Sequence, residues 1–227
     1  MSKTNPKIAL NQNKSKTLVV SFSGGRTSAY MTKRLLEEKS REFKDVIVIF
    51  ANTGQEHEKT LEFINNCDKK FNFNTVWIEA VTHKNKRIAS TAKVVDFKSA
   101  SRDGAPFEGV ISKYGIPWSK AGHCTRELKE YPIKNYLKSL GLSIDNRIMA
   151  IGIRADEAHR MSKSAEKNNM IYPLINWDVD KEDVLDWWDQ QEFDLEIPEH
   201  FGNCVWCWKK SYRKLMTVML ENPEAFK

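Results

Sequence analysis

Two features of this sequence have residue types and spacing that could do chemistry: a loop rich in glycine and hydroxyl groups, and a set of cysteines. The loop is SFSGGRTS at residues 21–28, and it separates an apolar run from a pattern with helical spacing. Glycines let backbone N–H groups approach an anion closely, and a helix start adds unpaired donors and the positive end of a dipole. Ser23, Thr27 and Ser28 add hydroxyl donors, and Arg26 adds positive charge. The loop therefore predicts phosphate binding, with a plain strand-to-helix turn as the alternative.

The loop matches neither the Walker A motif nor the Gly-x-Gly-x-x-Gly dinucleotide motif. The cysteines stand in a chain whose polar, lysine-rich beginning lacks the apolar core of a signal peptide, so we expect a cytoplasmic protein with reduced thiols. Cys204 and Cys207 have a spacing that lets two thiolates hold one metal ion or cluster, although a redox pair or chance also fits. Cys67 lies on the apolar side of a predicted helix and is expected in the core.

Several aromatic and basic residues have two interpretations. Trp187, Trp188, Trp206 and Trp208 could stack on nucleic-acid bases, but tryptophans of this kind also fill cores. The basic segment WKKSYRK at 208–214 could contact phosphate or form a solvated face. The net charge of +6 hints at a polyanionic partner, whereas the interspersed 36 basic and 30 acidic residues favour a mixed, solvated surface.

Alternating strands and helices must position these residues. Short apolar runs predict buried strands at 17–22, 45–52, 74–81 and 147–153, and helical spacing predicts helices at 27–39, 56–71, 125–141, 180–191 and 206–220. Alternation of this kind predicts a doubly wound, Rossmann-like parallel sheet of the α/β class. Pro132 is expected to kink or split its helix. Asp180 is the expected N-cap of the helix at 180–191.

The length of 227 residues suits one well-buried core. We expect a flexible lead at 1–16, a single nucleotide-binding domain at 17–227 and a small C-terminal helical lobe with cysteines at 195–227. Residues 83–122 are basic, small and Gly-containing, which predicts an active-site insertion or a partly mobile loop, with a weak helix near 107–114. No apolar run approaches the roughly 20 residues of a membrane span, so we expect no membrane partner.

Three ordered stretches resemble the PP-loop ATP pyrophosphatases, and particularly their phosphoadenylyl-sulfate (PAPS) reductase branch. SFSGGRTS resembles the family loop Ser-Gly-Gly-Lys-Asp-Ser, with Arg26 and Thr27 at the Lys and Asp positions. FANTG at 50–54 resembles a strand end in which Asp is common where this chain has Asn52, and GIRADEAHR at 152–160 resembles Gly-Ile-Arg-x-x-Glu-x-x-Arg. IYPLINW and DVLDWW also look like that branch.

The resemblance implies binding of ATP or a related adenosine nucleotide. It implies that the phosphates contact Ser23, Gly24, Gly25, Thr27 and Ser28. Gly152 and Arg154 would line the other side of the site, and Arg160 would be a second phosphate contact. Asn52 and Thr53 would lie beside the ribose or adenine, because open α/β sheets bind ligands at the carboxyl ends of their strands.

In this fold the α-phosphorus of ATP is typically attacked, which leaves an adenylylated substrate and pyrophosphate. Arg26, Arg154 and Asp156 are the expected catalytic residues, because charge developing on the leaving pyrophosphate needs neutralisation. Asp156 or Glu157 would hold Mg²⁺. The alternative for Arg154 and Arg160 is a structural ion pair with these carboxylates.

Iron–sulfur members of the family carry a Cys-Cys pair before a lysine-bearing helix and a Cys-x-x-Cys later. In this chain Cys124 stands at the first place, where His123 replaces the other cysteine, and Cys204 and Cys207 stand at the second. The resemblance implies a [4Fe-4S] cluster on these three cysteines, with an open iron that can carry sulfide or substrate. With His123 as fourth ligand the site would be a closed cluster or a zinc site, and no metal is the remaining alternative.

One departure bears on the reaction. PAPS reductases carry a catalytic cysteine in a C-terminal tail, whereas no cysteine follows Cys207 here, so the usual reduction route is not expected. The first hypothesis is therefore an enzyme that adenylylates a substrate and takes part in sulfur transfer, with nucleic acid as a candidate acceptor and a homodimer as a candidate assembly. Reduction of an adenylyl sulfate is the second hypothesis, and a non-catalytic nucleotide-binding module is the third.

Overall fold

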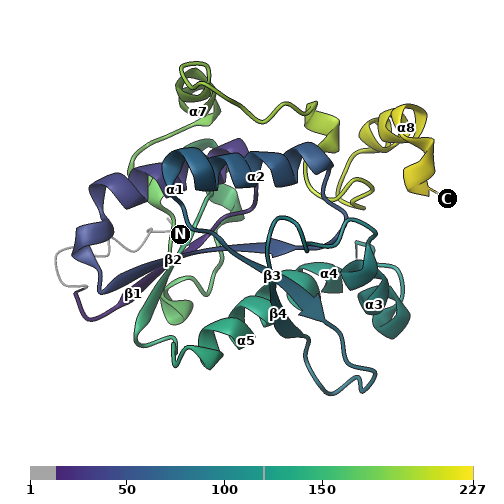
Figure 1. Cartoon of the computed structure of the whole chain (residues 1–227), viewed down its shortest axis with the longest axis horizontal. Helices are drawn as coiled ribbons and strands as arrows, with labels where there is room; N and C mark the ends of the chain where they lie inside the picture. Colours follow the sequence, from purple (N-terminus) through teal and green to yellow (C-terminus); the bar gives the residue numbers. More distant parts are fainter. Residues whose placement is uncertain (1–13, 120, 227) are drawn as a thin grey trace. The chain divides into compact units, whose positions relative to one another are not determined.

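The computed structural model describes residues 14–119 and 121–226, so most of the predicted lead at 1–16 lies outside the described residues. The predicted α/β class is confirmed: the described strands form a six-stranded sheet in the order β4-β3-β2-β1-β5-β6 (Figure 1). Parallel pairings join β1 to β2, β1 to β5 and β5 to β6, and β4 runs antiparallel to β3. The sheet is therefore mostly parallel, with an antiparallel edge.

The strands are β1 (Thr17–Ser21), β2 (Asp45–Asn52), β3 (Val76–Val81), β4 (Thr91–Val95), β5 (Arg147–Ile151) and β6 (Met170–Ile171). The α-helices are α1 (Arg26–Glu38), α2 (Glu58–Phe71), α3 (Ala105–Tyr114), α4 (His123–Thr125), α5 (Tyr131–Ser139), α6 (Pro173–Asn176), α7 (Lys181–Trp188) and α8 (Tyr212–Glu221). Shorter turns are η2 (Ser40–Glu42), η3 (Arg126–Glu130), η4 (Ala155–Arg160), η5 (Glu166–Asn168), η6 (Glu199–Phe201) and η7 (Pro223–Phe226). The four strands expected from the sequence are all present, with small shifts at their ends.

The chain is grouped into two compact units. Unit 1 contains the chain up to Phe50, Phe63–Val76 and Lys138–Leu195, and unit 2 contains Ala51–Glu62, Trp77–Leu137 and the chain from Glu196 onward. The single domain with an insertion and a C-terminal lobe stays a prediction. Among the described residues, no helix has the length and apolar content that crossing a membrane requires.

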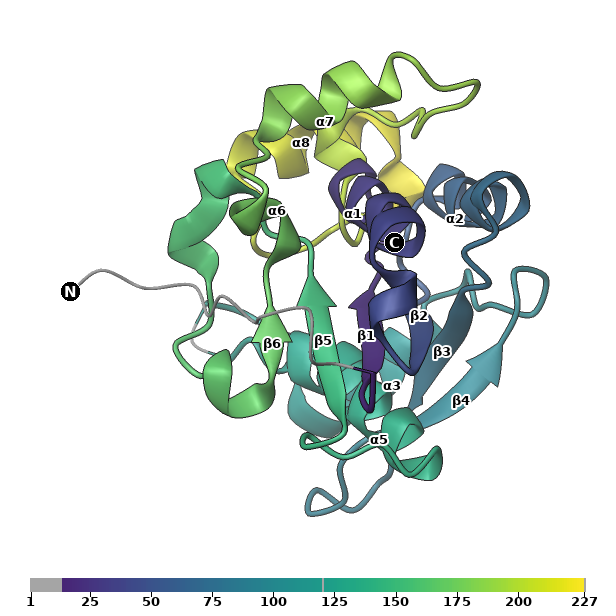
Figure 2. The same cartoon turned by 90° about the vertical axis from the view of Figure 1, so that its left-hand side faces the viewer.

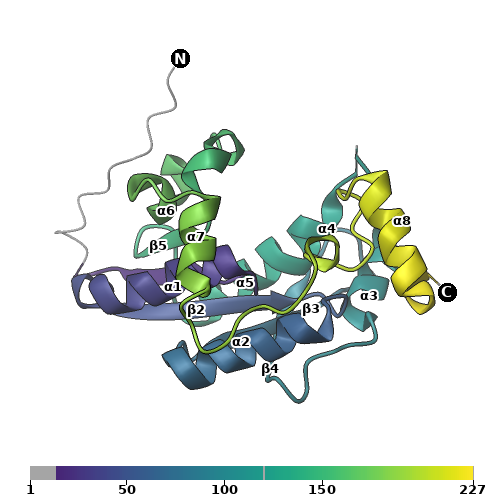
Figure 3. The ribbon, with the colours of Figure 1, turned by 90° about the horizontal axis from the view of Figure 1, so that it is seen from above.

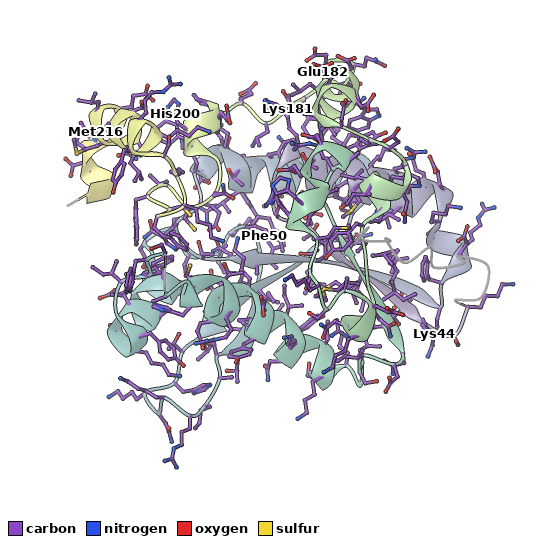
Figure 4. The ribbon with its side chains drawn as sticks, turned by 180° about the vertical axis from the view of Figure 1, so that it is seen from behind. Lys44, Phe50, Lys181, Glu182, His200 and Met216 are labelled. Carbon is purple, nitrogen blue, oxygen red and sulfur yellow. The ribbon has the colours of Figure 1, made fainter. Side chains whose placement is uncertain are left out.

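In unit 1, α1 lies on one face of β1 and α7 packs on the outer side of α1 (Figures 1 and 2). The inner face of α1 has helical spacing and consists of Ser28, Ala29, Met31, Thr32 and Leu35, all buried. On its outer side, the rings of Tyr30 and Trp187 meet edge to face at 5.3 Å. Figure 4 shows Phe50 in the interior, whereas Lys181 and Glu182 project from α7.

The N-terminus of α7 follows the sequence prediction. The Asp180 carboxylate accepts the amides of Glu182 and Asp183 at 2.8 and 3.1 Å, and the Asp183 side chain accepts the amide of Asp180 at 2.9 Å. This reciprocal capping satisfies amides that have no partner inside the helix. The predicted N-cap is therefore confirmed.

In unit 2, the segment 83–122 is more regular than expected. It contains β4, which pairs with β3 in a register that places Trp77 opposite Val95, and α3, which matches the weak helix predicted near 107–114. The irregularity expected at Pro132 takes the form of the π-helical turn η3, which ends just before α5. Proline is tolerated in the first turn of a helix, because its missing N–H would have no partner there.

The predicted start of the C-terminal helix at Trp206 is wrong. The helix α8 begins at Tyr212 and is the last long helix of the described chain (Figure 3). Ser211 accounts for this start, since its hydroxyl accepts the amide of Lys214 at 3.3 Å and caps the helix. The cysteine-containing residues before it form turns instead of a helix.

Candidate functional site

In unit 1 the predicted phosphate loop connects β1 to α1. Gly24 has a φ of 80°, in the left-handed region that favours glycine. Gly25 is the N-cap of α1, and no side chain in the described chain caps this helix. Its first amides, which lack partners inside the helix, are therefore left for another acceptor. Because the first turn also has no acidic residue, this helix end suits an anion.

Two serines hold the loop in shape. The Ser23 amide donates to Oγ of Ser28 at 3.2 Å, and the two hydroxyl oxygens lie 3.0 Å apart. Oγ of Ser28 donates to the carbonyl of Gly25 at 3.0 Å, and Ser28 is buried. The Ser28 side chain thus stabilises the loop through hydrogen bonds within it. The sequence analysis assigned Ser28 only as a phosphate contact.

Arg154 connects the segment after β5 to the start of α1. Its Nη1 donates to Oγ1 of Thr27 at 3.2 Å, while Nε and Nη2 donate to the two oxygens of Asp156, each at 2.9 Å. The hydrogen bonds to Asp156 raise the pKa of Arg154 and lower that of Asp156. Arg160 pairs with Glu157, so the ion pairs foreseen as the alternative are both present. Arg154 differs from Arg160 because it also reaches the phosphate loop.

Gly152 has a packing role that the sequence did not reveal. A Cβ atom at this position would lie 3.3 Å from Cα and 3.4 Å from Cβ of Ser28. Contacts this short are tighter than ordinary packing allows, so a side chain here would push α1 away from the segment after β5. Glycine therefore allows the two segments that carry Thr27 and Arg154 to approach closely.

Arg26 is bound to a carboxylate that sequence reasoning missed. Its Nε and Nη2 donate to the two oxygens of Asp194 at 2.6 and 2.7 Å, and Nη2 also donates to the carbonyl of Leu195 at 2.5 Å. The indole of Trp188 donates to the carbonyl of Arg26 at 3.1 Å. Asp194 lies in no motif and is 168 residues away along the chain, so no local pattern signals this pairing.

In unit 2, Asn52 is the centre of a buried polar network. Its Nδ2 donates to Oε1 of Glu79 at 2.7 Å and to the carbonyl of Ser101 at 2.9 Å, and its Oδ1 accepts the amide of Gly54 at 3.2 Å. Asn52 is fully buried and Glu79 is 3 % exposed. The only sequence signal for Glu79 is a charged residue within the apolar strand VWIEAV. Asn52 thus stabilises the loop after β2. Its expected contact with a nucleoside stays a prediction.

The residues after Asn52 hold the cysteine turn in place. Thr53 donates its amide and hydroxyl to the Glu56 carboxylate, and its hydroxyl lies 3.4 Å from Sγ of Cys204. The carbonyl of Gln55 accepts the amide of Val205 at 2.9 Å, and its side chain accepts the indole N–H of Trp206 at 2.9 Å. Burial raises the pKa of the Cys204 thiol to about 11, and the charge of Glu56 adds to this effect.

The three cysteines assigned to a cluster share one region of unit 2 without forming a ready-made metal site. Cys124 and Cys204 pack against one apolar cluster, which consists of Ala80, Phe107, Val110 and Leu128. The amide of Cys207 donates to the carbonyl of Cys204 at 3.1 Å. In the described part of the chain, no three His, Cys, Asp or Glu side chains are grouped as metal ligands. Nε2 of His123 lies 3.0 Å from the carbonyl of Gly115, so only Nδ1 is left for a ligand role. Cys67 is buried in the core, as predicted.

Comparison with known proteins identifies the family. The family model described as the phosphoadenosine phosphosulfate reductase domain matches residues 17–196. The chain belongs to this family. An uncharacterized nin region protein, ORF290, of Escherichia phage lambda is 38% identical over 200 residues, which cover 87% of this chain and 67% of the phage protein.

Two further proteins are more distant. The uncharacterized protein MJ0973 of Methanocaldococcus jannaschii is 28% identical over 175 residues, which cover 73% of this chain but 34% of that protein. The crystal structure of phosphoadenylyl-sulfate reductase from Candida auris, in a phosphate complex, is 16% identical with a TM-score of 0.46 and covers 76% of this chain and 71% of that one.

The match to the phosphoadenosine phosphosulfate reductase domain includes the predicted phosphate loop but only one of the three cysteines assigned to a cluster. The matched residues 17–196 contain the phosphate loop, Asn52, Cys124 and the segment with Arg154. Cys204 and Cys207 lie beyond the match. The family therefore supports a nucleotide site more strongly than it supports a cysteine cluster.

Proposed function

We propose that this family member binds ATP or a related adenosine nucleotide and adenylylates an acceptor with release of pyrophosphate. The observation that carries the proposal is the start of α1, whose first turn has no acidic residue and where Arg154 donates to Thr27 beside uncapped backbone amides. Amides at a helix start and a guanidinium together match the several negative oxygens of a polyphosphate.

In the proposed reaction, a nucleophilic oxygen of the acceptor attacks the α-phosphorus. A bond forms between the acceptor oxygen and this phosphorus, the bond from this phosphorus to the bridging oxygen breaks, and the acceptor proton passes to solvent. Negative charge grows on the departing pyrophosphate. The first amides of α1, the hydroxyl of Thr27 and the guanidinium of Arg154 would stabilise that charge.

Mg²⁺ belongs to the same proposal. Mg²⁺ is commonly held by one or two carboxylates together with substrate phosphates, and Asp156 and Glu157 provide two carboxylates on η4. Both already bind Arg154, since Nη1 of Arg154 lies 3.4 Å from Glu157 in addition to its bonds with Asp156. When bound, the ion would add positive charge near the phosphates, and the carboxylates would exchange part of their pairing with Arg154 for it.

Sulfur transfer is the finer part of the proposal. Three cysteines in one region of unit 2 support it, although their side chains are not grouped as ligands among the described residues. The test is an anaerobic preparation analysed for iron, acid-labile sulfide and zinc. About four iron atoms per chain would support the cluster, zinc alone would support a Cys3His site, and absence of both would contradict a metal site.

The nucleotide proposal is tested by ATP binding and by pyrophosphate release in the presence of RNA, DNA or no acceptor. We expect Arg154→Gln to weaken ATP binding by about 1.5–3 kcal/mol, because a charged hydrogen-bond donor is lost. Arg41→Gln removes the same charge from an exposed position on η2 in unit 1 and is the matched control. Equal ATP affinity of both variants and the wild type would contradict the assigned site.

The family model favours a second candidate function, reduction of an adenylyl sulfate. Sulfite formation from an adenylyl sulfate with a thiol reductant, together with no pyrophosphate release from ATP, would establish this second function in place of the first. Tight ATP binding with neither reaction would indicate a nucleotide-binding module.

A further inference from the structure

Unit 2 contains a pocket with three lysines in its wall, and none of its lining residues is assigned to the nucleotide. It has a volume of about 190 Å³, and its lining includes Lys209, Lys210 and Lys214 together with Cys207 and Glu199. A water molecule occupies about 30 Å³ of liquid, so the pocket has room for a small ion with part of its hydration shell. Sequence analysis identified the segment 208–214 only as basic.

The three lysines of the pocket differ in whether a carboxylate neutralises them. Nζ of Lys214 binds the Glu199 carboxylate at 2.7 Å, which neutralises one of the three ammonium groups. Nζ of Lys210 donates one hydrogen bond, to the carbonyl of Val205 at 2.7 Å, and retains two further N–H groups. Lys209 is exposed, with its ammonium 5.5 Å from the ring of Trp208. Two positive charges therefore remain without a carboxylate on the pocket wall.

Lys210 is half-buried, because its side chain lines the pocket and donates to the carbonyl of Val205. A partly desolvated ammonium with spare donors gains from an anionic ligand, and neighbouring lysines increase that gain.

We propose that this pocket binds the tetrahedral oxyanion of a phosphate group, supplied either as free phosphate or by the backbone of a nucleic acid. Lysine binds phosphate as a point charge, and the two ammonium groups that have no carboxylate partner match the charge of a dianion. Tyr212, directly after the pocket residue Ser211, is 89 % exposed and offers a ring face on which a base could stack. No residue of the predicted phosphate loop lines this pocket.

The test is site-resolved protection of lysines from acetylation, measured by mass spectrometry on the full chain. Inorganic phosphate is titrated at constant ionic strength in one arm, and a short single-stranded oligonucleotide in the other. We expect Lys210 and Lys214 to be protected, whereas Lys93, which is exposed on β4, is not. Lys214→Gln should weaken protection of Lys210 roughly five-fold, because it leaves the Glu199 carboxylate unpaired in the pocket wall, where it repels an anion. Lys93→Gln, which removes the same charge elsewhere in unit 2, should leave it unchanged.

The two arms distinguish the sources of the phosphate. Protection by inorganic phosphate alone supports a site for a free oxyanion, and protection by the oligonucleotide at lower concentration supports a nucleic-acid backbone. Protection in neither arm, equal protection of Lys93, or no effect of Lys214→Gln would overturn the proposal. Because the readout is confined to lysines of unit 2, failure of this proposal leaves the ATP proposal unaffected, and the reverse also holds.

Discussion

Replacing Asp194 with asparagine tests whether Arg26 takes part in nucleotide binding. Arg26 occupies the position at which the family pattern usually has lysine, yet its guanidinium is held by both oxygens of Asp194. If Arg26 contributes to phosphate binding, it has to exchange Asp194 for phosphate oxygens. Asp194 then competes with the ligand, and Asp194→Asn should tighten ATP binding.

The size of the effect follows from the geometry and exposure of the pair. The two hydrogen bonds are short and charge-assisted, at 2.6 and 2.7 Å, but the side chains are 29 % and 35 % exposed. After allowance for screening by solvent, such a pair contributes about 1 kcal/mol. Removing the carboxylate charge should therefore lower the dissociation constant of ATP about five-fold. The same change should lower the free energy of unfolding by about 1 kcal/mol.

The pH dependence gives a second measure. Burial acts to raise the pKa of Asp194, but hydrogen bonds from Arg26 and the amide of Leu195 outweigh it and hold the pKa below its ordinary value. The stabilisation is thus present above the unfolded-state pKa of about 3.9 and is lost as the pH falls through the folded-state pKa. The difference in unfolding free energy between wild type and Asp194→Asn should therefore shrink below about pH 4.

The assay is calorimetric titration with ATP, combined with urea unfolding of each variant. Asp186→Asn, which removes the same charge from an exposed position on α7, is the control. Weaker ATP binding by Asp194→Asn than by the control would refute competition and would show that Asp194 holds Arg26 ready for the ligand. Unchanged binding would remove Arg26 from the nucleotide site.

Three further predictions follow from the packing and polar networks. Asp180→Ala should lower the free energy of unfolding by about 1 kcal/mol, measured as a fall in Tm of about 2–4 °C, because two amides at the start of α7 lose their acceptor. Gly152→Ala should cost about 1–3 kcal/mol in urea unfolding and weaken ATP binding, since its Cβ would press on the backbone of Ser28; unchanged values would show that α1 adjusts freely. Asn52→Asp should cost about 2 kcal/mol or more at neutral pH, because the new carboxylate would share a buried site with the carboxylate of Glu79. Repulsion between the two carboxylates of the variant raises their pKa in the folded state, so the variant should regain stability as the pH is lowered. A loss of stability that does not depend on pH would contradict the reasoning.

Much of unit 1 could be predicted from the sequence because its signals are local. The strand β1 is a continuous apolar run, α1 shows helical spacing, and Asp180 precedes its helix at the N-cap position. The strand β4 gave no such signal: its residues TAKVV are mostly exposed or half-buried, so neither a continuous apolar run nor a clear alternation marks it. Its pairing with β3 defines it instead.

The candidate site shows the same limit at the level of single side chains. Motifs identified Thr27 and Arg154, and the structure brings these two residues into contact. They did not identify Asp194, which is far along the chain from Arg26, or the short distance between Gly152 and α1. Such partners are chosen by tertiary packing, and a single sequence contains no periodic signal for them.

Two of the positions at which the chain departs from its family pattern, Arg26 and Asn52, share one physical feature. Arg26 replaces a common lysine and binds the carboxylate of Asp194, and Asn52 replaces a common aspartate and donates to the carboxylate of Glu79. An aspartate at position 52 could not donate to Glu79, and a lysine at position 26 could not make the paired contact that a planar guanidinium makes. Each departure is therefore matched by a carboxylate outside the motifs. A motif residue and its distant partner should accordingly be exchanged together when the family pattern is restored in this chain.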